Sequence, residues 1–200
     1  MEYSYTNTFY QDPCSPTSQV VTQDQNASLW IMGLPSNITY NALLQSIRKA
    51  GRVKHTHIYR PDSRNPNACA VKLIFFSRDA AQRLCDQVSR GTFLVQGVAP
   101  IVTWNRFYTA EEPEDGRSRV LRIVGPSAIV NRKYLEEFWS YHLYWATDEV
   151  SDIGEIADGI AVVWYSFGGW LAQAGMARRL LLQYFGHWVT VTYETDPCEH

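Results

Sequence analysis

The order of apolar and polar segments repeats in the two halves of this 200-residue chain. An apolar strand that opens Leu29-Trp30-Ile31-Met32-Gly33 runs into a helical pattern, and Leu121-Arg122-Ile123-Val124-Gly125 does the same about ninety residues later. Each opening is followed by the periodicities of a helix, two strands, a second helix and a last strand. Because the same order occurs twice, the sequence predicts two copies of one small αβ domain rather than one large core.

Helix caps and turn residues define the elements of each copy. Thr39, Ser77 and Asn131 each precede a helical stripe, where their side chains can accept a hydrogen bond from the first turn. Residues 60–67 and the pair Asp158-Gly159 have the composition of turns between strands. The resulting order βαββαβ is that of the ferredoxin-like fold. The predicted class is α+β, with two domains that each contain a four-stranded antiparallel sheet and two helices on one face.

Composition sets the expected domain boundaries. Residues 1–27 are polar and lack apolar periodicity, so we expect a disordered tail. The first domain is expected at 28–109, an acidic linker at 110–118, the second domain at 119–195, and a short C-terminal tail at 196–200.

The net charge of −2 conceals a large difference between the two domains. Residues 28–109 carry eleven Lys and Arg against three Asp, a net +8, and residues 119–200 carry six bases and ten acids, a net −4. The linker 110–118 is net −3. Such a difference indicates an anionic partner for the basic domain and a protein partner for the acidic one.

Several classes of protein are disfavoured by the sequence. The four cysteines are scattered, and His55 and His57 have no third ligand near them, so no metal site is predicted. Neither a glycine-rich phosphate loop nor a catalytic triad pattern occurs, so we predict neither a cofactor nor an enzyme. No apolar run is long enough to cross a bilayer, and the N-terminus does not have the pattern of a secretory leader. We therefore expect an intracellular protein without a membrane partner, in the nucleus or the cytoplasm.

The order βαββαβ, with an aromatic residue at the second place of its first strand, resembles the RNA recognition motif (RRM). Leu29-Trp30-Ile31-Met32-Gly33-Leu34 matches the first-strand motif of that family, with Trp30 in the aromatic place and Gly33 where Asn is usual. The third-strand motif is weaker, because Ala70 and Lys72 stand where the family has two rings. The whole run is also similar to fungal proteins with degenerate tandem motifs of this kind.

The resemblance implies that single-stranded RNA lies on the first sheet, with a base stacked on Trp30. The other candidate contacts are side chains of the same sheet, of the loop between its second and third strands, and of the segment after its last strand. They are Met32, Arg60, Arg64, Lys72, Thr103, Asn105 and Arg106. Trp104 is expected in the core.

The second copy has weaker motifs. Arg122 stands where Trp30 stands in the first copy. If Ile160, Val162 and Trp164 face the core, Ala161 and Val163 face outward and give a base nothing to stack on. The second domain is therefore expected to be a scaffold or a protein-contact module.

Alternatives remain open on this evidence. In one, the chain is a protein–protein adaptor whose RRM folds no longer bind RNA. In another, basic and acidic domains of different copies associate, which predicts salt-sensitive oligomers. The linker acids Glu111, Glu112, Glu114 and Asp115 either fold over the first sheet and compete with RNA or stay solvated. A further option is that the acidic domain docks on the basic one.

Overall fold

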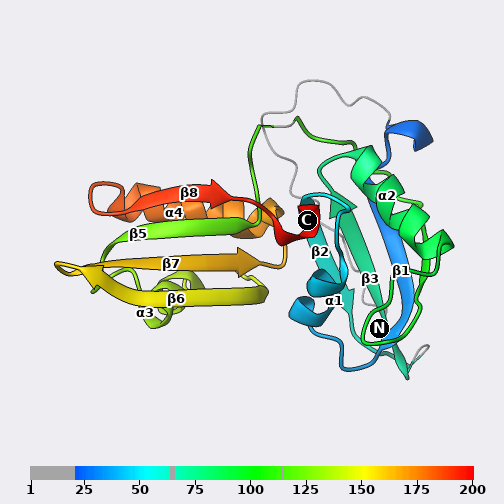
Figure 1. Ribbon diagram of the computed structural model, residues 1–200, viewed down its shortest axis with the longest axis horizontal. Coiled ribbons are helices and arrows are strands. Elements are labelled where there is room, and N and C mark those ends of the chain that lie inside the picture. The colour runs from blue at the N-terminus through cyan, green and yellow to red at the C-terminus, as the bar shows by residue number, and fades with distance from the viewer. Residues whose placement is uncertain (1–20, 64–65, 114) are drawn as a thin grey trace, which may run out of the picture.

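The computed structural model describes residues 21–63, 66–113 and 115–200 and divides them into two αβ domains (Figure 1). The elements of the first are β1 (Ser28–Pro35), α1 (Tyr40–Ser46), β2 (Val53–Tyr59), β3 (Ala68–Phe75), α2 (Arg78–Ser89) and β4 (Ile101–Trp104). The elements of the second are β5 (Val120–Pro126), α3 (Arg132–Ser140), β6 (Thr147–Ala157), β7 (Ile160–Phe167), η2 (Trp170–Ala174), α4 (Gly175–Phe185) and β8 (Thr190–Glu194). Two 3₁₀ turns, η1 (Gln23–Gln25) and η3 (Pro197–Glu199), flank them.

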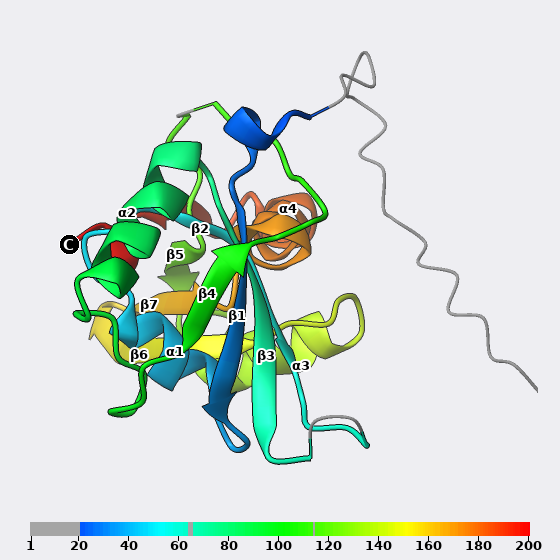
Figure 2. The same cartoon turned by 90° about the vertical axis from the view of Figure 1, so that its right-hand side faces the viewer.

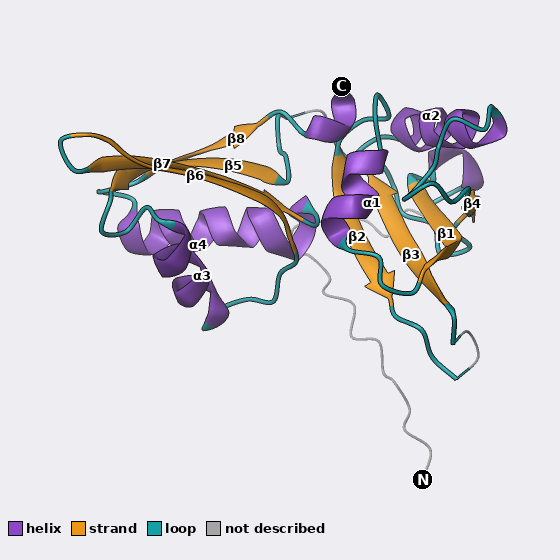
Figure 3. Cartoon of the chain, turned by 60° about the horizontal axis from the view of Figure 1, so that its bottom comes forward, coloured by secondary structure: helices purple, strands orange, loops and turns teal. Residues whose placement is uncertain are grey.

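Each domain contains one four-stranded antiparallel sheet. The strand orders are β2-β3-β1-β4 and β6-β7-β5-β8, so the two sheets have the same topology. Both helices of the second domain lie on one side of its sheet (Figure 3). The predicted fold class, two ferredoxin-like βαββαβ domains, is confirmed. None of the helices in the described part of the chain is long and apolar enough to span a membrane.

The predicted caps begin three of the helices. The side chains of Thr39, Ser77 and Asn131 accept hydrogen bonds from the backbone N–H groups three residues later, at 3.1, 3.2 and 2.9 Å. Each bond satisfies a first-turn donor that has no partner within its helix.

Each domain has its own apolar core between the sheet and the helices. Each strand contributes every second side chain to the core, and each helix contributes apolar side chains at positions i and i+4. The first core includes Leu29, Ile31, Leu43, Val71, Leu73, Phe75 and Leu84. The second includes Leu121, Ile123, Leu135, Trp139, Tyr165, Phe167 and Leu181.

The segment before β1 belongs to the first domain. Asn26 and Ala27 are buried, and Asn26 forms a bridge with Ala110. The packed part of the first domain therefore begins before residue 28, where the sequence placed its start, although β1 itself begins at Ser28. The expected tail at 1–20 lies outside the described residues.

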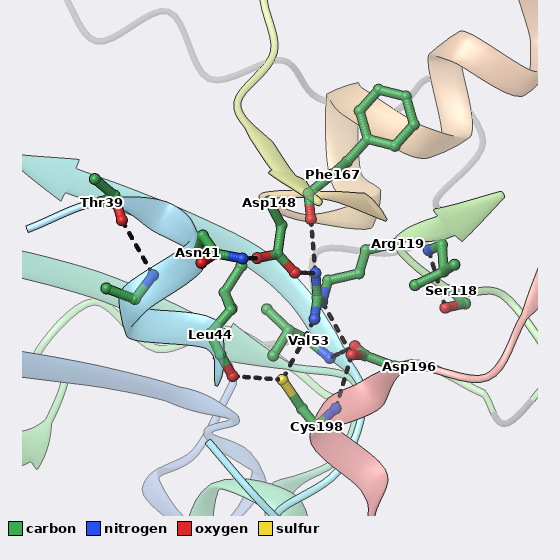
Figure 4. A network of polar contacts seen from close by, with 12 residues as sticks. Thr39, Asn41, Leu44, Val53, Ser118, Arg119, Asp148, Phe167, Asp196 and Cys198 are labelled. Atoms are coloured by element: carbon green, nitrogen blue, oxygen red, sulfur yellow. Dashed lines mark hydrogen bonds and ion pairs between the residues drawn. The ribbon is translucent and has the colours of Figure 1, made fainter. Parts of the chain in front are cut away.

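A buried ionic network joins the two domains (Figure 4). The guanidinium of Arg119, which is fully buried, donates to Asp148 through Nη1 at 2.6 Å and to Asp196 through Nε at 2.9 Å. Both carboxylates also bind the first domain: Asp148 accepts from Asn41 Nδ2 at 3.1 Å, and Asp196 from the backbone N–H of Val53 at 2.8 Å. Burial alone would lower the pKa of Arg119, but the two carboxylates outweigh it and raise that pKa. The network thus fixes one domain against the other.

The C-terminal segment docks on the first domain. Cys198 is buried in the first core, and its Sγ contacts the carbonyl of Leu44 at 3.5 Å. Its own carbonyl accepts from the N–H groups of Ala50 and Gly51 at 3.0 and 3.1 Å. Residues 196–200, expected as a tail, are therefore part of the packed structure.

Candidate nucleic-acid interface

The alternation of side chains along β1 and β3 gives the first sheet one buried and one open face. Leu29 and Ile31 are buried, whereas Trp30 is partly exposed on the opposite side. In the register of the sheet, Trp30 lies between Lys72 of β3 and Thr103 of β4. These three side chains therefore form a row across the open face. Figure 2 looks onto strands β4, β1 and β3 of this sheet.

An aromatic cluster extends the row onto β2. The ring centroid of Tyr59 lies 5.1 Å from that of Trp30 and 4.5 Å from that of His57. The planes of Trp30 and Tyr59 are inclined by 50°, so Tyr59 supports the indole from the side. Tyr59 and His57 were not among the predicted contacts, although they occupy alternate positions at the end of β2.

The open face is hollowed beside Trp30. The hollow has a volume of about 520 Å³. Its lining residues are Trp30, Tyr59, Lys72, Thr103, Trp104, Asn105, Arg106 and Phe107. A cleft of this size with flat rings and a few cations matches the general form of a site for a small planar group.

The segment after β4 forms one wall of the hollow. Phe107 is 61% exposed, and the guanidinium carbon of Arg106 lies 5.1 Å from its ring centroid. Asn105 is buried: its Oδ1 accepts from the N–H of Phe107 at 3.0 Å, and its carbonyl accepts from Asn26 Nδ2 at 3.0 Å. Asn105 thus shapes the turn that carries Arg106 and Phe107, and its side-chain oxygen is already engaged.

Two other predicted contacts, Met32 and Arg60, are not among the residues that line the hollow. Met32 is partly exposed on the open face, opposite Ile101 of β4. The guanidinium of Arg60 donates to the carbonyl of Ile38 at 2.7 Å, which holds it near the start of α1. Arg64 lies outside the described residues. Trp104 is partly buried against the first core, as expected, and also lines the hollow. Its ring centroid lies 3.9 Å from the guanidinium carbon of Arg78.

The basic groups of the open face influence one another. Burial lowers the pKa of Lys72. Burial and the charge of Lys72 lower the pKa of His57, and burial, with Lys72 as the next cause, lowers that of His55 to about 4. At neutral pH both imidazoles are uncharged, so Lys72 is the cation in the middle of the face.

The second sheet differs from the expectation. Ala161, Val163 and Tyr165 face the core, and Trp164 is partly exposed on the opposite face. The expectation that Trp164 faces the core was wrong, because the rings of Tyr165 and Phe167 fill that space.

The open face of the second sheet carries a row of three side chains like that of the first sheet, but the tryptophan and the cation have exchanged strands. Arg122 lies between Trp164 of β7 and Thr192 of β8, and its guanidinium carbon is 5.7 Å from the indole. In the first sheet the central strand carries the tryptophan and its neighbour the cation; in the second the central strand carries the cation. Both sheets thus present one Trp, one cation and one Thr.

The acidic linker binds the edge of the first domain. Glu112 accepts from Lys54 Nζ at 2.6 Å and from Arg117 Nη2 at 3.2 Å, and its N–H donates to the carbonyl of Phe76. Burial opposes ionisation of Glu112, but Lys54 and Arg117 hold its pKa below the usual range. Glu111, Glu112 and Asp115 are absent from the lining of the hollow, and Glu114 lies outside the described residues.

Comparison with known proteins adds a likeness of architecture. No family model matches the chain, and no curated protein sequence matches it. Among solved structures, RNA recognition domains 1 and 2 of Sex-lethal from Drosophila melanogaster are 17% identical, with 84% of this chain and 100% of that chain covered and a TM-score of 0.31. The first two RRM domains of the yeast poly(U)-binding protein are 13% identical, with coverage of 84% and 99% and a TM-score of 0.33. At these low scores, the functional argument rests on the side chains of the chain itself.

Proposed function

We propose that the chain is an RNA-binding protein that holds single-stranded RNA on the open face of its first sheet. The observation that carries the proposal is the hollow in which Trp30 and Tyr59 lie beside Lys72 and Arg106. An exposed ring stacks on an unpaired base, and a duplex hides the faces of its bases, so the site favours single strands. The cations suit phosphates, and the net +8 of residues 28–109 favours the approach of a polyanion.

The arrangement indicates a short site with limited sequence preference. Tyr59 is tilted against Trp30, which leaves Trp30 and Phe107 as the rings on which bases can stack. The hydroxyl of Thr103 donates to the carbonyl of Trp30 at 3.4 Å, so it is partly engaged within the sheet. Stacking and phosphate contacts tolerate many sequences, so we expect weak to moderate affinity.

Replacing Trp30 with alanine tests the platform. If the indole stacks on a base, Trp30→Ala weakens the binding of a short single-stranded RNA by about 1–3 kcal/mol, measured by fluorescence anisotropy. Trp188→Ala is the matched control, because Trp188 is 68% exposed on the second domain. Equal affinities of Trp30→Ala and the unmodified chain, with the fold retained by circular dichroism, would rule the platform out.

A second candidate function is a protein-contact role of the second domain. The ring centroid of Phe138 on α3 lies 5.6 and 5.1 Å from those of Tyr184 and Phe185 on α4, and 4.9 Å from that of His142 in the turn after α3. Tyr184 is 55% exposed, and partly exposed aromatic clusters are enriched at protein interfaces. In the adaptor alternative, Tyr184→Glu abolishes capture of a partner protein and Trp30→Ala leaves RNA affinity unchanged. An RNA affinity that depends on Trp30 argues against that alternative.

A further inference from the structure

Five of the ten described cations of the first domain have an ion-pair, ring or carbonyl partner away from the helical groove described below. Arg52 and Lys54 form ion pairs with Glu199 and Glu112, at 3.7 and 2.6 Å. The guanidinium groups of Arg78 and Arg106 lie over aromatic rings, and that of Arg60 donates to a backbone carbonyl. The hollow on the open face is lined by only two of these ten cations, Lys72 and Arg106, so most of the charge of the domain lies elsewhere.

The four remaining described cations line one groove on the helical side of the domain. This basic groove, of about 420 Å³, is lined by Arg48, Lys49, Arg83 and Arg90, with Ser46, Gln87 and Thr92. All four cationic residues are exposed, and within residues 21–63, 66–113 and 115–200 none of them forms an ion pair. The basic groove shares no lining residue with the hollow on the sheet.

Side chains of α2 hold one wall of the basic groove in place. Arg83 Nε donates to the carbonyl of Ala50 at 2.7 Å, and Gln87 Nε2 donates to that of Arg48 at 2.7 Å. Gly51 allows the turn to lie directly on the helix, since an added Cβ would stand 2.6 Å from the Cβ of Ala80. The turn at residues 48–51 is thus bound to α2, and its cations are presented by a rigid wall.

The C-terminal segment of the second domain holds the same turn from behind. The N–H of Lys49 donates to the carbonyl of His200 at 3.1 Å, and the N–H groups of Ala50 and Gly51 donate to Cys198. These bonds support the left-handed backbone of Lys49, whose φ is 51°. The shape of the basic groove therefore depends on the docking of the two domains.

We propose that the basic groove is a second RNA-binding site, which takes phosphates of a strand whose bases lie on the first sheet. This proposal rests on the proposed function. Arg83 of α2 and Arg90, which caps the C-terminus of that helix, are seven residues apart, about two turns and roughly 10 Å. The cations are therefore spread along the groove, as binding to a polyanion requires. The walls are polar, and guanidinium groups match phosphate oxygens with paired N–H donors. The sheet then contributes stacking, and the basic groove contributes most of the electrostatic attraction.

The test measures the affinity of the full chain and of a groove variant for a short and a long single-stranded RNA. The variant carries Arg48→Gln and Arg90→Gln, because no described bond holds the Arg48 side chain and Arg90 Nε bonds only to Asp86 of its own helix. The probes are labelled single strands of about 6 and about 20 nucleotides, below and above the site size of one small domain. We expect the long strand to bind about tenfold more weakly at low salt, with a salt slope reduced by about 1.4 for two lost phosphate contacts. The short strand keeps its affinity.

The matched control carries Lys133→Gln and Arg179→Gln, which removes two exposed cations from the second domain. If both double variants weaken the binding of long RNA equally, the proposal is overturned, because the loss then follows from the net charge of the protein and not from the groove. Unchanged affinity for long RNA overturns it as well. Tighter binding of a glutamate oligomer than of RNA, lost in the groove variant, assigns the groove to an acidic protein instead. If Trp30→Ala has no effect on short RNA while the groove variant weakens long RNA, the sheet proposal fails. A strand shared by sheet and groove is then overturned as well, and the basic groove binds RNA by itself.

Discussion

Replacing Arg119 with methionine should lower the free energy of unfolding of the full chain by about 3–5 kcal/mol. Methionine fills a similar length of space but leaves Asp148 and Asp196, whose side chains are 5% and 0% exposed, without their shared cation. The loss is expected near the lower limit, because Asn41 still donates to Asp148 and the N–H groups of Val53 and Cys198 still donate to Asp196.

Urea denaturation followed by tryptophan fluorescence measures this loss. Arg132→Met is the matched control, because the Arg132–Glu136 pair is exposed and its loss costs only about 0.3–0.5 kcal/mol. Since the network joins the domains, the unmodified chain should unfold in one transition and the Arg119 variant in two. Asp148→Asn and Asp196→Asn, added to Arg119→Met, should restore part of the stability because they remove the unpaired charges. A loss below about 1 kcal/mol would refute the buried network as the link between the domains.

Two further predictions concern the open faces of the sheets. Burial lowers the pKa of His55 to about 4, and the charges of Lys72, His57 and Lys54 add to this shift. The unfolded chain therefore takes up a proton at His55 near pH 6.5, whereas the folded chain takes it up only near pH 4. The free energy of unfolding should have its full value above pH 6.5 and fall by about 3 kcal/mol as the pH drops to 4. Urea denaturation measured at several pH values in this range checks the fall, and His55→Gln should reduce it. Trp164→Ala should leave the affinity for short RNA within about 0.5 kcal/mol, whereas a loss of 1–3 kcal/mol would assign base stacking to the second sheet.

The fold was predictable because its signals are local. The alternation that buries Leu29 and exposes Trp30, and the caps at Thr39 and Ser77, act within a few residues of sequence. Tyr59 alternates with His57 along β2, but its role depends on contact with Trp30 of β1, which lies two strands away in the sheet and 29 positions away in the sequence.

The remaining differences depend on contacts between distant residues. Trp164 is large and apolar, and only the competing rings of Tyr165 and Phe167 explain why it lies outside the core. The role of residues 196–200 was equally hidden, since Asp196 and its partner Val53 are 143 positions apart. The basic groove combines α2, a turn and this distant segment, so single-sequence patterns do not bring its cations together.

The docking of the C-terminal segment has a consequence for synthesis. The first domain receives two of its partners only after the end of the second domain has been synthesised. They are Cys198, which is buried in its core, and Asp196, which accepts from the N–H of Val53. At about 5–20 residues per second, the roughly 80 residues from Arg119 onward take about 4–16 s to translate. During that interval the emerging first domain has no acceptors for the N–H groups of Ala50 and Gly51, and its loop at 48–51 has no support from behind. The nascent chain therefore exposes the open face of its first sheet before its basic groove is complete. Under the proposed function, RNA contact on the ribosome would begin on the sheet, without the electrostatic attraction of the groove.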